Sequence, residues 1–300
     1  MKTPLIAIDW GSTNFRAKLV LDGLVIASVE TPDGIRNRSG RDFDDILTEH
    51  CALWKEEHPG AYIVMSGMIG SREGWVEAPY VPAPARIADL SEGLVSISSR
   101  TLGEIAIVPG VRYDAPESGT TDVMRGEETQ IAGLLAEYGD EDITLCLPGT
   151  HSKWIKCRDG AILSFRTWLT GEAFDLLTRQ SLIAGSEHPA DAQSDAFHRG
   201  LALSGGDGGL LHHLFLGRTE MLSGRITAAE MRSILSGILL GHEIREALDF
   251  AEPDARLLLV GESPAAQATA SALTWWKTPF QHQTNDTHLP GILAILRASL

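Results

Sequence analysis

The chain has few cysteines, few positive charges and no long hydrophobic run. Its three cysteines among 300 residues, Cys51, Cys146 and Cys157, are widely spaced and match neither a zinc motif nor a disulfide framework. We therefore expect buried thiols in a reducing compartment, which points to the cytoplasm. The apolar run before Asp9 is too short for a signal peptide, and no stretch approaches the ~20 residues of a membrane span.

Positive charge is outnumbered, with 25 Lys and Arg against 40 Asp and Glu, for a formal net charge of -15. An acidic surface repels phosphate backbones, so nucleic acid is not an expected partner. A nucleotide can still bind, because backbone N–H groups and a metal ion act locally. The length and a hydrophobic content of 43% predict a globular protein of two domains.

A hairpin pattern occurs twice along the chain. A short apolar strand runs into Asp9, a polar turn follows at residues 11–14, and an alternating segment leads to Asp22-Gly23. The same order recurs from Ile143, with a polar turn at residues 149–153 and Asp-Gly at 159–160. Asp-Gly between alternating segments favours a two-residue hairpin turn, because both central residues take positive φ. The repeat predicts two similar halves, with chance resemblance of two hairpins as the alternative.

Both polar turns carry groups that suit phosphate. Glycine lets the backbone approach closely, while N–H groups and hydroxyls donate to phosphate oxygens. Asp9, at the end of a strand, can hold a Mg²⁺ ion through water. An ordinary polar turn is the alternative for the first of them. The residues we expect to bind the phosphates of ATP are Gly11, Ser12, Thr13 and Asn14 in the first turn, and Gly149, Thr150, His151, Ser152 and Lys153 in the second.

A phosphoryl transfer also needs a carboxylate that accepts the proton of the acceptor hydroxyl. Glu127 is the first candidate, because it follows Gly126 in the first turn of an expected helix, where the helix dipole favours negative charge. Asp122 is the second candidate. A solvated helix start is the alternative for Glu127. Gly261, after an apolar strand at Arg256–Val260, would leave room for a flat adenine ring, and a plain strand-to-helix turn is the alternative.

These motifs together resemble the actin-like ATPase superfamily, which includes sugar kinases, Hsp70 and actin. Residues 9–14, 147–153 and 257–261 are similar to its first phosphate, second phosphate and adenosine motifs. The resemblance implies an α/β fold of two actin-like (ribonuclease H-like) domains with a nucleotide cleft between them. Two positions depart from the superfamily pattern: Glu262 replaces a second glycine, and Glu127 stands where carbohydrate kinases have the catalytic aspartate.

Longer strings narrow the resemblance to the 2-dehydro-3-deoxygalactonokinase family. They are residues 66–75, 78–84, 122–130, 148–154 and 170–172, so the likeness extends over essentially the whole chain. It implies transfer of the γ-phosphate of ATP to the 6-hydroxyl of 2-dehydro-3-deoxy-D-galactonate, with Mg²⁺, in galactonate breakdown. The residues expected to bind the sugar acid are Ser66, Gly67, Met68, Ser71, Arg72 and Trp75.

Arg72 is the expected partner of the substrate carboxylate, because a guanidinium can pair with it bidentately, and a plain surface arginine is the alternative. Ser66, Ser71 and Glu73 can bond hydroxyls, and Trp75 can cover an apolar sugar face. Other arginines suited to an anion are not ranked by the sequence: Arg16, Arg125 and Arg166. The histidines His282 and His288 lack ligand spacing and receive no role.

We expect a first domain over residues 1–113 and a second over 114–300, with the last helix returning to the first. The expected partners are ATP and a small sugar acid, and a homodimer is left open. A kinase for another sugar or sugar acid is the alternative function, because a fold does not fix a substrate. A non-catalytic ATP-binding regulator is the other alternative.

Overall fold

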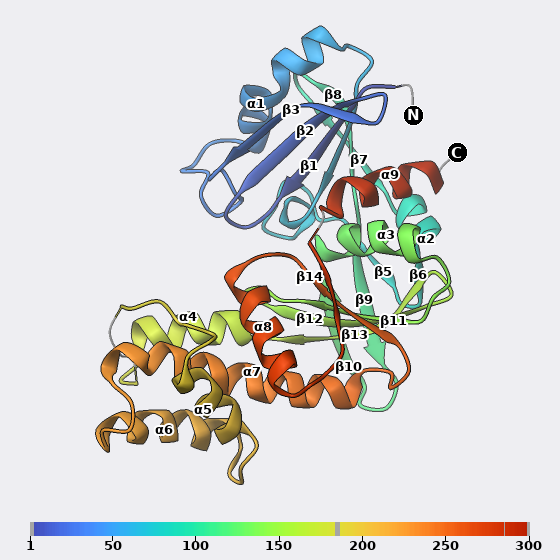
Figure 1. The fold of residues 1–300 in the computed structure, drawn as a ribbon. Helices are drawn as coiled ribbons and strands as arrows, with labels where there is room; N and C mark the ends of the chain where they lie inside the picture. Colours follow the sequence, from blue (N-terminus) through green and yellow to red (C-terminus); the bar gives the residue numbers. More distant parts are fainter. Residues whose placement is uncertain (1–2, 184–186, 285, 299–300) are drawn as a thin grey trace. The chain divides into compact units, whose positions relative to one another are not determined.

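The computed structural model describes residues 3–183, 187–284 and 286–298. As far as these residues define it, the chain divides into two compact units (Figure 1). The first unit comprises residues 1–141, 158–164 and 286–300, and the second comprises 142–157 and 165–285.

The first unit is built on a six-stranded sheet with the order β3-β2-β1-β4-β8-β7. Strand β1 pairs antiparallel with β2 and parallel with β4, in a register that sets Asp9 opposite Ser66. The ends of β1 and β4 therefore lie side by side. The strands are β1 (Leu5–Trp10), β2 (Phe15–Leu21), β3 (Leu24–Thr31), β4 (Tyr62–Ser66), β7 (Val95–Ser99) and β8 (Gly103–Ile107).

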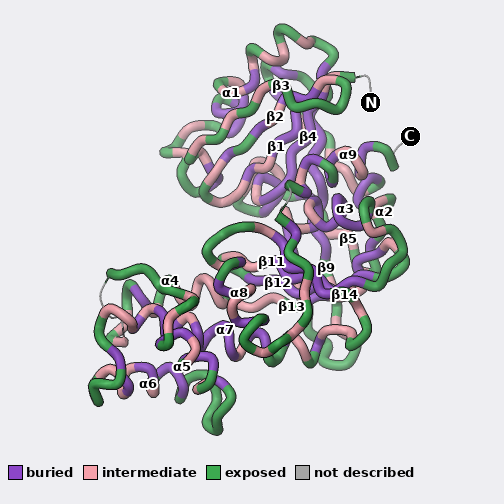
Figure 2. Tube along the Cα trace, viewed as in Figure 1, coloured by how far each residue is buried: buried purple, intermediate pink, exposed green. Residues whose placement is uncertain are grey.

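Burial explains why these segments form strands. In β1 every residue but Asp9 is buried (Figure 2), and from Phe15 to Leu19 of β2 buried and more exposed residues alternate. Helix α1 (Phe43–Glu57) adds its apolar side to the same core, and its N-cap Asp42 accepts from the backbone N–H of Asp44.

The rest of the first unit holds a small sheet and a set of short helices. Its strands have the order β10-β9-β5, and β6 pairs with Ala161 and Ile162 at the start of β13. The elements are η1 (Met68–Gly70), β5 (Tyr80–Pro82), β6 (Ala85–Arg86), α2 (Ile87–Glu92), β9 (Gly110–Ala115), β10 (Thr120–Met124), α3 (Glu127–Tyr138) and α9 (His288–Ala298).

Helices α3 and α9 pack with their backbones in contact. A Cβ atom built on Gly291 of α9 would lie 1.7 Å from the carbonyl oxygen of Thr129, and one on Gly133 of α3 would lie 2.3 Å from that of Thr287. Only glycine fits at these two positions, so the last helix is held firmly against the element that begins with Glu127.

The second unit repeats the strand pattern of the first. Strand β11 pairs antiparallel with β12 and parallel with β14, as β1 does with β2 and β4. The order is β15-β14-β11-β12-β13. The strands are β11 (Ile143–Leu147), β12 (Ser152–Arg158), β13 (Ala161–Trp168), β14 (Arg256–Val260) and β15 (Gln281–Gln283).

The two Asp-Gly turns confirm the predicted hairpins. Asp22 and Gly23 have φ values of 50° and 83°, and Asp159 and Gly160 have 52° and 68°. Positive φ at both central residues is the geometry that matches the twist of the flanking strands.

Helices complete the second unit. Gly200 of α5 and Gly237 of α7 face the backbone of the opposite helix, so the two helices pack closely. The elements are α4 (Thr170–Gln180), α5 (Asp195–Ser204), α6 (Gly209–Leu222), η2 (Ala228–Glu230), α7 (Met231–Phe250) and α8 (Pro264–Trp275). Among the described helices, none is long and apolar enough to cross a membrane.

The three cysteines are buried and unpaired, as the sequence predicts. Burial raises the pKa of Cys51 to about 12 and raises that of Cys146 well above its ordinary value.

The compact units do not follow the expected division at residue 113. Residues 114–141 group with the first unit, because β10 pairs with β9 and α3 packs against α9. The last helix does belong with the first unit, as expected.

We predict that Gly291→Ala lowers the free energy of unfolding by about 2–3 kcal/mol, because its methyl group overlaps backbone that cannot move away. Alanine favours a helix by about 1 kcal/mol over glycine, so any net loss reports the clash. Urea unfolding measures it. Gly60→Ala is the control, since nothing lies within 4 Å of its Cβ position, and it should stay within about 0.5 kcal/mol of the parent. Equal stabilities for both variants would contradict the packing.

Candidate functional site

In the first unit, polar groups converge where β1 and β4 end. Asp9 and Ser66 are register partners, and the Oγ of Ser66 lies 2.7 Å from Nε2 of His288. Gly67 follows with φ of 93°, and a Cβ there would lie 2.8 Å from the Trp10 carbonyl oxygen and 3.4 Å from Oδ1 of Asp9. The backbone at Gly67 thus lies directly beside the Asp9 carboxylate, which only glycine permits.

His288 is a residue of this cluster that the sequence analysis gave no role. Burial lowers its pKa, although the charges of Asp9 and Asp286 oppose the change. The imidazole is therefore mainly neutral near pH 7 and can donate to or accept from Ser66. The contact joins positions 222 residues apart, so no local pattern could have found it.

Asp9 is held by an arginine. Its Oδ2 lies 3.3 Å from Nη1 of Arg16, while Nε of Arg16 bonds Glu30 at 2.8 Å. The described residues contain no group of three His, Cys, Asp or Glu side chains that could hold a metal ion. Asp9 therefore offers a single carboxylate. That donor set suits Mg²⁺, which usually keeps several waters and takes its remaining ligands from substrate phosphates.

The first turn is fixed through its carbonyl groups. The N–H groups of residues 34–36 donate to the carbonyl oxygens of Thr13, Gly11 and Ser12, at 3.1, 3.1 and 3.0 Å. The backbone N–H groups of Ser12 and Thr13 have no partner among the described residues. The turn thus has fixed acceptors and spare donors, the arrangement that an anion needs.

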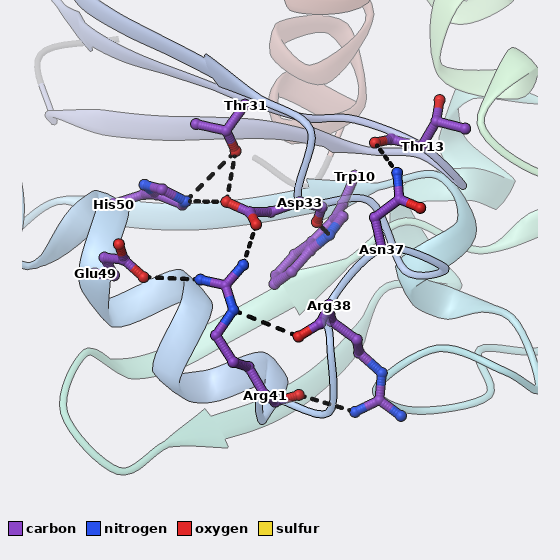
Figure 3. A network of polar contacts seen from close by, with 9 residues as sticks. All are labelled: Trp10, Thr13, Thr31, Asp33, Asn37, Arg38, Arg41, Glu49 and His50. Carbon is purple, nitrogen blue, oxygen red and sulfur yellow. Dashed lines mark hydrogen bonds and ion pairs between the residues drawn. The ribbon is translucent and has the colours of Figure 1, made fainter.

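Two side-chain hydrogen bonds link the end of β1 and the first turn to residues 33–37, which follow β3 (Figure 3). The indole N–H of Trp10 donates to the carbonyl oxygen of Asp33 at 2.8 Å, and Nδ2 of Asn37 donates to that of Thr13 at 3.1 Å. The turn and the segment after β3 are therefore bound to each other from both sides.

Asp33 is the centre of the network in Figure 3. Burial alone would raise its pKa, but hydrogen bonds from His50, Thr31 and Arg41 outweigh burial and lower it. The carboxylate is held ionised, and it ties helix α1 to the segment that supports the first turn.

The start of α3 meets the same cluster. Gly126 has φ of 107°, and a Cβ there would lie 3.3 Å from the Cα of Gly67. Oε2 of Glu127 accepts from the backbone N–H of Arg125 at 3.1 Å. Asp122, the other candidate base, lies on β10 opposite Tyr113, and its Oδ1 accepts from the N–H of Val123.

Glu128 is a buried carboxyl group that the sequence analysis did not single out. Its Oε2 accepts from the N–H of Gly126 at 2.6 Å. Burial, with a smaller contribution from the charge of Glu127, raises its pKa to about 8, although Arg125 opposes the change. Glu128 is thus mainly protonated at neutral pH.

The segment predicted to bind the sugar acid folds as a tight loop. Ser71 is buried, and Trp75 stacks with Phe43 at a centroid distance of 6.5 Å. Met68 packs against the core. The structure thus brings Ser66 and Gly67 to Asp9. Arg72 points away from the core: its side chain is 88% exposed, and Nε lies 3.9 Å from Glu77.

In the second unit, the second turn lies against the start of α4. A Cβ on Gly171 would lie 2.3 Å from the carbonyl oxygen of Gly149, and the N–H of Glu172 donates to the carbonyl of Thr150 at 2.9 Å. Nε2 of His151 lies 2.6 Å from the Glu172 carboxylate. A helix N-terminus beside a glycine turn favours an anion.

Ser152 and Lys153 of this turn are buried. The Ser152 hydroxyl donates to Oε1 of Glu243 at 2.5 Å, and the indole of Trp154 donates to the same oxygen at 2.9 Å. Ser152 is therefore bonded to Glu243. Oε2 of Glu243 has no partner among the described residues, and burial raises the pKa of this carboxyl group.

A cavity of about 490 Å³ lies within the second unit, and Glu243 lines it. Its volume is in the range of small-molecule sites. Gly261 has φ of 99° and precedes Ser263, which caps α8. The lining comes from the second turn, the start of α4, a loop, α7 and the start of α8: Pro148, Gly149, Ser152, Thr170, Gly171, Phe174, 189–193, Ser236, Leu239, Leu240, Glu243, Pro264, Ala265 and 267–269.

Comparison with known families gives one match across nearly the whole chain. The model of 2-keto-3-deoxy-galactonokinase matches residues 9–295. A 2-dehydro-3-deoxygalactonokinase of Escherichia coli (strain K12) is 35% identical over 268 residues, which is 89% of this chain and 88% of that protein.

Solved structures agree. A crystal structure from Sinorhizobium meliloti, provisionally named a 2-dehydro-3-deoxygalactonokinase, has a TM-score of 0.87 at 30% identity and covers 98% of both chains. Component A of the (R)-2-hydroxyglutaryl-CoA dehydratase of Acidaminococcus fermentans has a TM-score of 0.51 at 11% identity, covering 99% of this chain and 100% of that one, which shows the fold alone. The predicted actin-like α/β fold is confirmed.

We predict that stability depends on pH through Glu128. Between pH 4.5 and about 8 the folded protein keeps a proton on Glu128 that the unfolded chain releases. This contribution to stability is complete below pH 4.5 and is lost as the pH rises through about 8. Glu128→Gln lacks this carboxyl group, so from pH 5 to pH 8 its free energy of unfolding should rise by about 3–4 kcal/mol relative to that of the parent.

Urea unfolding at the two pH values measures the difference. Glu57→Gln, at the exposed end of α1, controls for the removal of one negative charge. Parallel pH profiles for the parent and Glu128→Gln would mean that Glu128 is ionised in the folded state.

Proposed function

The chain belongs to the 2-keto-3-deoxy-galactonokinase family, and we propose that the cluster of Asp9, Gly67 and Glu127 is where it phosphorylates its substrate. The protein is an ATP-dependent kinase of 2-dehydro-3-deoxy-D-galactonate that acts in galactonate breakdown. The observation that carries the site is the contact of three backbone segments: the ends of β1 and β4 and the start of α3 all meet at Gly67.

ATP is bound through its phosphates by the two turns and through its nucleoside by the cavity of the second unit. The spare N–H groups of Ser12 and Thr13 support the first assignment. The position of α4 against Gly149 and Thr150 supports the second, since a helix N-terminus attracts phosphate. Asn14, His151 and Lys153 complete the two turns. The mainly apolar lining of the cavity, which extends to the start of α8 after Gly261, suits a flat base.

Asp9 would hold Mg²⁺ through water, and this ion would neutralise charge on the phosphates. Asp9 is kept oriented by Arg16, and the Oγ of Ser66 by His288. The sugar acid lies along the loop of Ser66, Gly67, Met68, Ser71, Arg72 and Trp75. In the reaction, Glu127 accepts the proton of the 6-hydroxyl while the γ-phosphoryl group passes to that oxygen.

Turnover assays test the activity. We expect ADP release that depends on 2-dehydro-3-deoxy-D-galactonate, with the 6-phosphate as product. Rates with other sugar acids and with plain hexoses provide the comparison. A preference for a hexose would overturn the substrate assignment, and ATP binding without turnover would favour a regulatory protein.

Two isosteric substitutions test the base. Glu127→Gln should lower kcat about 10²- to 10⁴-fold while nucleotide affinity is kept, because the amide cannot accept the proton. Asp122→Asn is the matched control for loss of one carboxylate nearby in sequence. Steady-state kinetics and ATP titrations measure both effects. If Asp122→Asn loses kcat and Glu127→Gln keeps it, the base is Asp122.

A further inference from the structure

In the first unit, three side-chain atoms around Gly70 are buried without a hydrogen-bond partner. They are Nε and Nη1 of Arg125 and Oγ of Ser71, and none has a partner among the described residues. Nitrogens of a guanidinium can only donate, and a serine hydroxyl can donate. These three atoms therefore lack a hydrogen-bond acceptor.

The rest of Arg125 is fixed. Nη2 donates to the carbonyl oxygen of Ala78 at 2.7 Å, and the guanidinium lies over the ring of Tyr80 at 4.3 Å from its centroid. The residue is only 8% exposed. A side chain held this way presents its remaining nitrogens in a constant direction, which lowers the entropic cost of binding a ligand.

Gly70 connects the two unpartnered groups. A Cβ on Gly70 would lie 3.1 Å from Nη1 of Arg125, and Ser71 is its neighbour in the chain. The backbone of Gly70 is itself fixed, because its carbonyl accepts from the N–H of Ala78 at 2.9 Å. Any side chain at position 70 would crowd Nη1 of Arg125 as well as Ile107 and Ala78, and glycine avoids this.

No carboxylate of the described residues bonds the guanidinium of Arg125, because Nη2 bonds a carbonyl oxygen and Nε and Nη1 have no partner. Glu127 accepts from the backbone N–H of Arg125, and burial raises the pKa of Glu128 to about 8. A buried cation that no carboxylate bonds is costly, and an anionic ligand lowers the cost.

We propose that Arg125, with the hydroxyl of Ser71, binds the carboxylate of the sugar acid and makes the enzyme specific for acids over neutral sugars. The assignment rests on the proposed function and replaces Arg72 in this single role. Arg16 is already bonded to Asp9 and Glu30, and Arg166, in the second unit, lies over Phe250 at 4.8 Å. The exposed Arg72 would gain little from a carboxylate, because solvent screens the pair.

The test compares the sugar acid with its methyl ester, which has the same hydroxyls but no negative charge. We expect the unmodified enzyme to favour the acid in kcat/KM about 10- to 100-fold, the usual effect of hydrogen bonds to a charged group. Arg125→Gln should bring this ratio close to one by slowing the acid and leaving the ester within about threefold. Arg72→Gln should keep most of the preference.

Arg112→Gln is the matched control, because Arg112 lies on β9, is half exposed and pairs with Asp114. It should leave the ratio unchanged. A loss of folded protein lowers both rates equally, so the ratio reports on recognition alone. If Arg125→Gln does not fold, Ser71→Ala carries the same test, with a smaller fall in the ratio, because it removes only a hydroxyl.

The outcomes separate the two proposals. If the unmodified enzyme phosphorylates the acid but Arg125→Gln or Ser71→Ala keeps the full preference, the carboxylate is bound elsewhere and the kinase assignment stands. If Arg72→Gln abolishes the preference, Arg72 is the receptor. If the unmodified enzyme phosphorylates neither compound, the proposed function itself is wrong.

Discussion

The parallel pairing of β1 with β4 is the constraint on which the site of the first unit depends. It fixes Asp9 opposite Ser66, and the chain then turns at Gly67 with positive φ. A one-residue slip of this register would turn Asp9 towards the other face of the sheet. Ile6, Ile8, Ile63 and Met65 pack in one hydrophobic core, and such a slip would move the side chains of one strand out of it. The hydrophobic core of the sheet thus also sets the position of the Asp9 carboxylate.

Backbone segments approach each other closely in both units. Side chains at Gly67 and Gly171 would collide with a neighbouring segment, and one at Gly126 would press against Gly67. A polar backbone brought this close to another must have its hydrogen bonds met, and around the first turn residues 34–36 meet them. The N–H groups of Ser12 and Thr13 have no acceptor among the described residues and are therefore available to a ligand.

Much of the fold could be predicted from the sequence, because its signals are local. The two Asp-Gly turns, the strand before Asp9 and the helix after Gly126 follow from short-range pattern alone. The return of the last helix to the first unit was predicted, but the grouping of residues 114–141 with that unit was not, because it depends on contacts of α3 with α9 across the chain. The same holds for parts of the site. His288 reaches Ser66, and Glu243 reaches Ser152, over distances in sequence that carry no periodic signal.

Burial also distinguishes residues of the same type that look alike in the sequence. Arg72, Arg125 and Arg16 have the same chemistry in the sequence, and only the structure tells the exposed arginine from the enclosed and the paired ones. Glu127 and Glu128 are adjacent in the chain, yet only Glu128 is fully buried. Such differences depend on which side of an element faces the core, and one residue of offset reverses them.

The enclosed sulfur atoms have a practical consequence. A thiol reacts as its thiolate, and Cys51, with a pKa of about 12, is almost never in that form at neutral pH. Cys146 and Cys157 are protected by burial in the same way. Maleimide dyes should therefore not label the three native cysteines while the protein is folded. A cysteine introduced at an exposed position would be labelled alone, so pairs of such positions could report distances within the enzyme during turnover without removal of any native residue.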